Sequence, residues 1–157
     1  MSGAELAALF RRDLTRLAQE LRAVPHDDVL WSKPAGVVNS IGNLVLHLAG
    51  NLREYIGRQL GGVPYRRERA LEFTETGLTK DSLLARTEPL AILIPEIIAR
   101  LSDADLKRLY PEEPFNSPLS TAQYLVSLNN HLNYHLGQID YLRRILTGSG
   151  AVDFAQL

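Results

Sequence analysis

The segment LNNHLNYHLGQIDYLRRIL, which spans residues 128–146, decides the fold of this 157-residue chain. Leucine and isoleucine recur in it at steps of three and four residues, so they fall on one side of an α-helix, in which successive residues are about 100° apart. Ser120 and Gln123 form a capping box before this apolar stripe, and the sequence TGSG follows it. We therefore expect a helix from about residue 120 to about residue 146.

Two earlier stretches show the same periodicity. The first covers about residues 3–23, begins at a capping box formed by Ser2 and Glu5, and ends before Pro25. The second covers about residues 40–60 and ends at a Gly-Gly pair. Both stretches are long enough to be principal helices of the fold.

A third stretch, about residues 81–101, contains Pro89 and Pro95. Each proline removes a hydrogen bond within a helix and clashes with the preceding turn, so we expect this helix to be kinked or split. Long connections that are rich in proline, glycine or polar residues join the four stretches: 25–40, 61–79 and 102–118. The first and the last connection each allow a short helical turn, around residues 29–31 and 103–109, and the middle one is expected to be a surface crossover.

No stretch alternates as a β-strand does, and the sequence contains no internal repeat. Four long amphipathic segments with long connections are typical of an all-α four-helix bundle that has crossover connections. The length is that of one domain, residues 1–157.

The composition excludes several classes of function. With 17 basic and 18 acidic residues, the chain lacks the positive charge that binds nucleic acid. The most apolar run, LAILIPEIIA at residues 90–99, is much shorter than the roughly 20 residues that span a membrane, and no signal peptide is evident at the start. We expect a cytoplasmic protein that binds neither nucleic acid nor membranes. Cysteine is absent, so a metal site would use His, Asp, Glu or water.

Three of the four histidines are candidates for such a site. His131 and His135 are four residues apart, at the edge of and inside the apolar stripe of the last helix, and His47 lies at the border of the stripe of the second helix. Together they would offer three nitrogens to one cation, with water in the remaining positions. Border histidines also commonly bond to backbone carbonyls, and this alternative stays open. His26, beside two aspartates in a connection, is not included.

Two segments resemble the signature helices of the DinB/YfiT-like superfamily, in particular an uncharacterised bacterial branch: NSIGNLVLHLAGNLREYIG at 39–57 and LNNHLNYHLGQIDYLRRIL at 128–146. In that family, one histidine of the second helix and an H-x-x-x-H pair of the last helix bind a divalent metal. The resemblance thus implies this role for His47, His131 and His135. It also implies a four-helix bundle with a crossover connection, often dimeric, and some relatives are transferases or isomerases that use low-molecular-weight thiols.

Three neutral imidazoles leave a divalent cation with its full charge and with exchangeable positions. Our first hypothesis is a metal-dependent enzyme, thiol S-transferase-like or hydrolase-like, that acts on a small molecule such as a low-molecular-weight thiol. Zinc is the first choice of metal, with nickel or iron as alternatives. A non-catalytic metal-binding or stress-response module that dimerises is the alternative, and histidines that are only hydrogen-bonded are the third reading.

Further side chains near these histidines could hold the ligands in place or contact the substrate: Asn51, Glu54 and Gln138. Glu54 could act as a general base or accept a hydrogen bond from an imidazole, although an exposed ion pair with Arg58 four residues later is the simpler expectation. The basic cluster around Arg67 could receive an anionic substrate if the crossover covers the site, and is a solvated loop otherwise. No residue is assigned a catalytic role.

Overall fold

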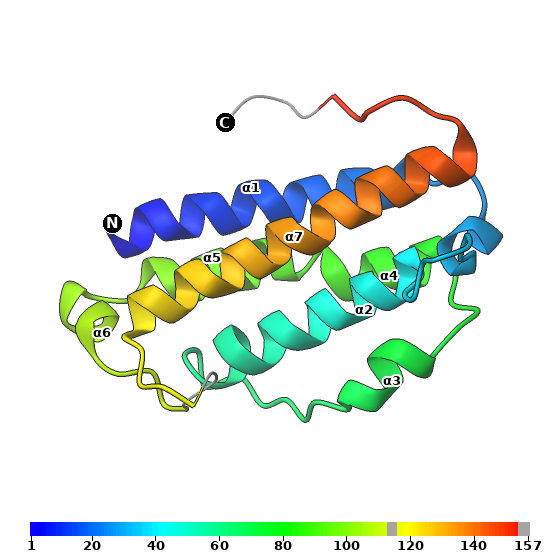
Figure 1. Ribbon diagram of the computed structural model, residues 1–157. Coiled ribbons are helices and arrows are strands. Elements are labelled where there is room, and N and C mark those ends of the chain that lie inside the picture. Colours follow the sequence, from blue (N-terminus) through cyan, green and yellow to red (C-terminus); the bar gives the residue numbers. More distant parts are fainter. Residues whose placement is uncertain (113–115, 154–157) are drawn as a thin grey trace.

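The computed structural model describes residues 1–112 and 116–153, and this part of the chain is helical without any strand (Figure 1). It forms a four-helix bundle with crossover connections, as the sequence predicts. The second long helix continues beyond its α-helical part as a π-helical segment, η2, and the third long helix consists of two pieces. The elements of the bundle are α1 (Gly3–Arg22), α2 (Ile41–Leu52), η2 (Arg53–Arg58), α4 (Lys80–Thr87), α5 (Leu90–Ala99) and α7 (Thr121–Thr147).

The long helices form a ring in which α1 packs against α5 and α7, and α2 packs against α7 and α4. α1 and α7 run in one direction, and α2 and the α4–α5 pair run in the other (Figure 1). α1 and α2 are therefore diagonal neighbours, joined across one end of the bundle. The connection from α2 to α4 returns along the whole length of α2, because both helices run in the same direction.

The predicted helix ends are present. The capping boxes at Ser2 with Glu5 and at Ser120 with Gln123 both form, and Gly148 ends α7 in a left-handed conformation with φ of 67°. The third helix is split at Pro89, which precedes α5, while Pro95 lies inside α5. Local sequence thus sets where the rods of the bundle begin and end.

The described parts of the connections contain three short helical segments. Two of them, η1 (Asp27–Trp31) and α6 (Asp103–Lys107), lie where the sequence predicts short turns. The third, α3 (Arg69–Thr74), was not expected within the crossover 61–79. An isolated helix of this length is not stable in water, so α3 depends on its packing against α2.

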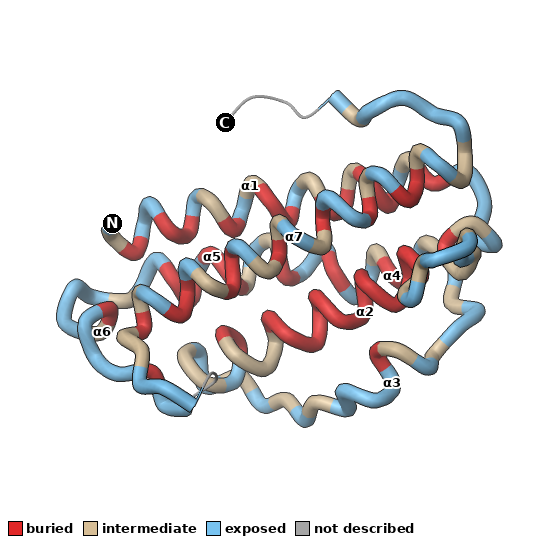
Figure 2. Tube along the Cα trace, viewed as in Figure 1, coloured by how far each residue is buried: buried red, intermediate tan, exposed pale blue. Residues whose placement is uncertain are grey.

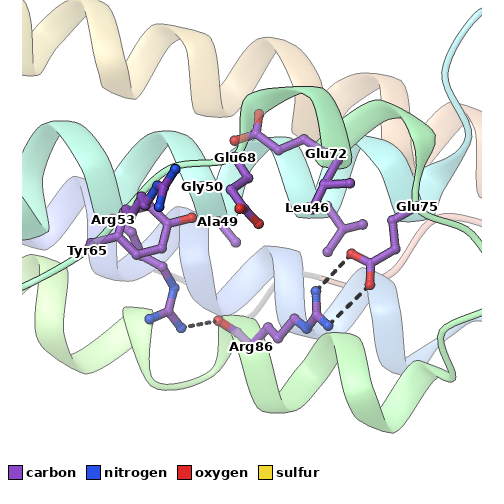
Figure 3. A pocket seen from close by; sticks show the side chains of 11 residues that line it. Leu46, Ala49, Gly50, Arg53, Tyr65, Glu68, Glu72, Glu75 and Arg86 are labelled. Atoms are coloured by element: carbon purple, nitrogen blue, oxygen red, sulfur yellow. Dashed lines mark hydrogen bonds and ion pairs between the residues drawn. The ribbon is translucent and has the colours of Figure 1, made fainter.

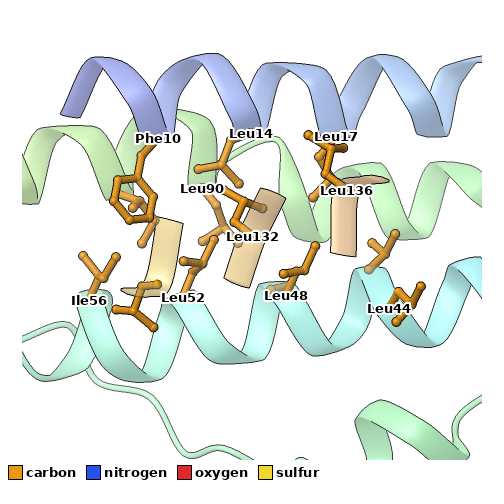
Figure 4. Close-up of a cluster of buried hydrophobic side chains, with 14 of the residues drawn as sticks. Phe10, Leu14, Leu17, Leu44, Leu48, Leu52, Ile56, Leu90, Leu132 and Leu136 are labelled. Carbon is orange, nitrogen blue, oxygen red and sulfur yellow. The ribbon is translucent and has the colours of Figure 1, made fainter. Parts of the chain in front are cut away.

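The core is apolar and lies between the four rods. Its centre is formed by side chains of three long helices and of α5 (Figure 4): Phe10, Leu14, Leu17, Leu44, Leu48, Leu52, Ile56, Leu90, Leu132 and Leu136. Every residue of α2 from Ile41 to Leu52 is buried (Figure 2). The crossover and α3 cover the side of α2 that the bundle leaves open, so the polar side chains on that side are buried too.

Among the described residues, no helix combines the length and the apolar character that a membrane crossing requires.

Candidate metal centre

Three histidine side chains from two helices meet between α2 and α7. Nε2 of His131 lies 3.1 Å from Nε2 of His47 and 3.1 Å from Nε2 of His135. One ring nitrogen from each of the three residues lies within 4.8 Å of the other two. His47 is buried, and the two histidines of α7 are half-buried. The structure thus brings together the three histidines grouped from the sequence, and such a group could bind a metal ion.

His47 is held by a carboxylate that the sequence analysis did not identify. Its Nδ1 lies 2.8 Å from Oε2 of Glu72. Burial acts to raise the pKa of Glu72, but hydrogen bonds from His47 and Arg67 outweigh it and hold this pKa below its usual value. Because an ionised carboxylate only accepts hydrogen bonds, His47 donates from Nδ1 and presents the lone pair of Nε2 to the other histidines.

His135 is arranged in the same way. Its Nδ1 lies 2.7 Å from Oε1 of Gln138, which accepts a hydrogen bond and leaves the lone pair of Nε2 facing His131. Nδ1 of His131 is buried and has no hydrogen-bond partner within the described part of the chain. A neutral His131 can place only one proton between the two lone pairs that face it, whereas a cation at this point would accept a lone pair from all three rings.

The rings of His131 and His135 have little tendency to protonate. Burial, followed by the charges of His135, His47 and Arg67, lowers the pKa of His131 from 6.5 to about 4. Burial also lowers the pKa of His135, although the hydrogen bond with Gln138 acts in the opposite direction. Both rings are therefore neutral at physiological pH, which is the protonation state that binds a metal.

The spacing of the nitrogens suits a metal ion. Zinc binds imidazole nitrogen at about 2.0–2.1 Å, so two nitrogens of one tetrahedral site lie roughly 3.3–3.4 Å apart. The two measured separations of 3.1 Å are close to this value. Three nitrogen donors without a charged ligand fit a borderline cation such as Zn²⁺ better than Mg²⁺ or Ca²⁺, which prefer oxygen.

The crossover 61–79 covers the outer side of this histidine group. The ring of Phe73 lies with its centroid 4.9 Å from that of His47, and Arg67 binds both oxygens of Glu72, at 2.6 and 2.9 Å. Glu72 itself is 6% exposed. Sequence reasoning missed Glu72 because an acidic residue in a connection rich in arginine, glycine and proline resembles a solvated residue.

Glu54 forms no described contact with the three histidines. It pairs with Arg58, whose Nε lies 2.8 Å from Oε1 of Glu54. α2 ends at Leu52, and Glu54 lies in η2, whose backbone forms hydrogen bonds from residue i to i+5, as between Glu54 and Gln59. The simpler expectation for Glu54, an ion pair with Arg58, is the one observed, and Glu72 is the carboxylate beside His47.

The two other predicted neighbours differ in what they contact. Gln138 touches the histidine group through His135. Asn51 is buried one turn after His47 on α2, and its Oδ1 has no hydrogen-bond partner among the described residues. No described contact joins Asn51 to the histidines. His26 caps η1 and is not part of the group.

The bundle and the histidine group define the chain as an all-helical protein with a candidate metal centre between its second and last long helices. It belongs to the DinB superfamily, whose family model matches residues 7–139. The fold is similar to that of a DinB-like protein from Bacillus cereus ATCC 10987, with a TM-score of 0.68 and 19% identity over 89% of this chain and 91% of that one. It is also similar to that of a conserved protein from Enterococcus faecalis, with a TM-score of 0.73 and 17% identity over 95% of this chain and 99% of that one. No curated protein matches the sequence significantly.

Proposed function

We propose that the chain binds one divalent metal ion through Nε2 of His47, His131 and His135 and uses it as a metal-dependent enzyme. The observation that carries the proposal is the convergence of these three nitrogens, with Nδ1 of two rings held by Glu72 and Gln138. In metal-binding histidines, the ring nitrogen that does not bind the metal typically donates a hydrogen bond to an oxygen of the protein. Zinc is the proposed metal, and nickel or iron are alternatives, because imidazole suits all three.

Three protein ligands leave room for a substrate on the cation, so we infer a transferase or hydrolase rather than a structural site. A divalent cation held there supplies the charge that lowers the pKa of a thiol or of water and polarises an electrophile. The protein's own part is to orient the three rings and to keep those of His131 and His135 neutral. No side chain of the described chain is assigned as a general base.

The proposed substrate is a small molecule, of which a low-molecular-weight thiol is the first candidate. A cleft of about 480 Å³ lies beside the crossover, and Arg66, Arg67 and Arg69 line it. Arg67 is paired with Glu72, whereas Arg66 and Arg69 have no carboxylate partner within the described residues. These two guanidinium groups would receive an anionic group of the substrate.

Calorimetry with succinate tests this part of the proposal. We expect saturable binding by the wild-type protein and at least about tenfold weaker binding when Arg66 and Arg69 are both replaced by glutamine, since two charge-assisted contacts are lost. The matched control is Arg100→Gln, at the exposed arginine that follows α5. Equal binding by all three proteins would contradict an anion site in this cleft.

The second candidate function is a non-catalytic metal-binding or stress-response module that acts as a dimer. Exposed apolar side chains on α7 favour a homodimer in either case: Tyr134, Tyr141 and Ile145 are 64–65% exposed. An Ile145→Glu variant that sediments as a monomer would support this interface, and an unchanged mass would contradict it. We further propose a cytoplasmic protein without nucleic-acid partners, in view of its balanced charge.

Metal analysis of protein purified without a histidine tag or a nickel column tests the central proposal. We expect about one equivalent of metal per chain, and less than roughly half an equivalent would contradict a dedicated site. His47→Ala separates the two candidate functions once a reaction is assayed. An enzyme loses turnover, whereas a structural module loses mainly stability.

A further inference from the structure

The crossover packs against one face of α2. Asn43, His47 and Gly50 follow one another at steps of four and three residues on this face. The side-chain Nδ2 of Asn43 donates to the backbone carbonyls of Glu72 and Glu75, at 3.2 and 3.1 Å. The backbone of α3 is thereby fixed above His47.

Gly50 provides the space in which the carboxylate of Glu72 lies. A Cβ atom at position 50 would lie 2.9 Å from Cδ of Glu72 and still closer to its Oε1, which real Cβ atoms do not do. The carboxylate cannot move aside without loss, because Arg67 holds both of its oxygens and His47 lies 2.8 Å from Oε2. Any side chain at position 50 would therefore remove Glu72 from His47.

A cavity beside Gly50 could receive the displaced carboxylate of Glu72. A cavity of about 310 Å³ lies between α2, α4 and the crossover, and both Gly50 and Glu72 line it (Figure 3). Ala49 and Leu46 form its floor on α2, and the ion pair of Arg86 with Glu75 lies at its edge. A substitution at Gly50 would thus cost the contact with His47 rather than the fold.

We propose that Gly50 is a positioning residue: by admitting Glu72, it fixes His47 with Nδ1 protonated and Nε2 directed at the cation. This inference rests on the proposed metal site. It assigns a function in metal binding to a residue without a side chain, and it makes the metal affinity depend on how the crossover is seated on α2.

A zinc titration against a chromophoric chelator tests the proposal with four proteins: wild type, Gly50→Ala, Glu72→Ala and the double variant. We expect Gly50→Ala to weaken zinc binding about 10- to 100-fold, the usual effect of losing a group that orients a ligand. The control is Gly137→Ala on α7, where a Cβ atom meets no atom within 4 Å and zinc affinity should be unchanged. Both glycine replacements give the same gain in helix propensity, so their difference reports the contact with Glu72.

The double variant shows whether Gly50 acts through Glu72. If it does, adding Gly50→Ala to Glu72→Ala changes the zinc affinity by less than about twofold. Three results would overturn the proposal. In the first, the losses of zinc affinity in the two single variants multiply in the double variant. In the second, Gly50→Ala binds zinc as tightly as Gly137→Ala does, and in the third, metal-free Gly50→Ala does not fold.

A second readout does not require metal. In the metal-free protein, the nitrogen chemical shifts of His47 should report the tautomer protonated at Nδ1 in the wild type and a mixture of tautomers in Gly50→Ala. An unchanged tautomer in Gly50→Ala contradicts this inference alone. Absence of zinc binding by the wild type contradicts the proposed metal site instead, so the two failures are distinguishable.

Discussion

The helix α7 carries a polar cluster on each of two sides, and the two clusters are built in opposite ways. Toward α1, the fully buried carboxylate of Asp13 receives hydrogen bonds from Arg12 at 2.6 and 3.1 Å, from Asn129 at 3.0 Å and from Asn133 at 2.7 Å. Every one of these contacts joins a donor to an acceptor. This cluster is complete without any further group.

Toward α2, lone pairs outnumber the protons that could lie between them. Three imidazole nitrogens face one another, two of them as lone pairs, and one ring nitrogen behind them is buried without a partner in the described chain. A buried polar group without a partner lowers stability, whereas a paired one contributes to it. The comparison shows how a structural polar cluster differs from a functional one: the first balances its own donors and acceptors, and the second is balanced only by a ligand.

Of the changes considered, we expect the loss of one histidine to have the largest effect on zinc affinity. His131→Ala removes the nitrogen that lies between the other two, so zinc affinity should fall by more than about 100-fold, beyond the usual effect of residues that only support a ligand. The stability of the metal-free protein should change little, because the lost ring has an unpartnered Nδ1. Competition titration and urea unfolding measure the two quantities, and a large loss of metal-free stability would mean that the histidines form a structural cluster.

Asp13→Ala should have the reverse effect. Four donor contacts lose their acceptor, and the free energy of unfolding should fall by about 3 kcal/mol, as is usual when one partner of a buried charged cluster is removed. Zinc affinity should remain that of the wild type. An Asp13→Ala variant that keeps its stability but no longer binds zinc would contradict the distinction between a structural and a functional cluster.

We expect a fall in pH to lower the stability of the metal-free protein through His131. The folded pKa of His131, about 4, is below its unfolded value of 6.5, so the unfolded chain binds this proton more readily. The contribution to metal-free stability is complete above pH 6.5 and is lost as the pH falls toward 4. Urea unfolding across this range should show a smaller loss in His131→Ala than in the wild type, and identical pH profiles would contradict the assigned environment of His131.

The smallest effect is expected at Glu54. Its ion pair with Arg58 lies at the surface, so Glu54→Gln should change the free energy of unfolding by no more than about 0.5 kcal/mol and leave zinc affinity unchanged. The same titration and unfolding experiments measure this. A tenfold loss of zinc affinity would restore Glu54 as a residue of the site.

The sequence predicted those features that depend on periodicity and on local capping. The four rods, the capping boxes at Ser2 and Ser120 and the break at Pro89 follow from spacing and from backbone chemistry, which a single segment contains. The three histidines could be grouped because each lies at or inside the apolar stripe of its own helix.

The remaining features depend on contacts between segments. Glu72 reaches His47 only because the crossover returns along α2, and α3 is helical only because it packs there. Glu54 lies in the π-helical η2, whereas heptad spacing assumes an unbroken α-helix. A polar residue in an irregular connection carries no periodic signal of its partner, so Glu72 could not have been found from the sequence alone.

The most direct test is a crystal structure of untagged protein, with data collected on both sides of the absorption edge of each candidate metal. We predict one anomalous peak between α2 and α7, about 2.0–2.2 Å from Nε2 of His47, His131 and His135. Density without such a peak between the three rings would contradict the account and would make the group a hydrogen-bonded part of the core.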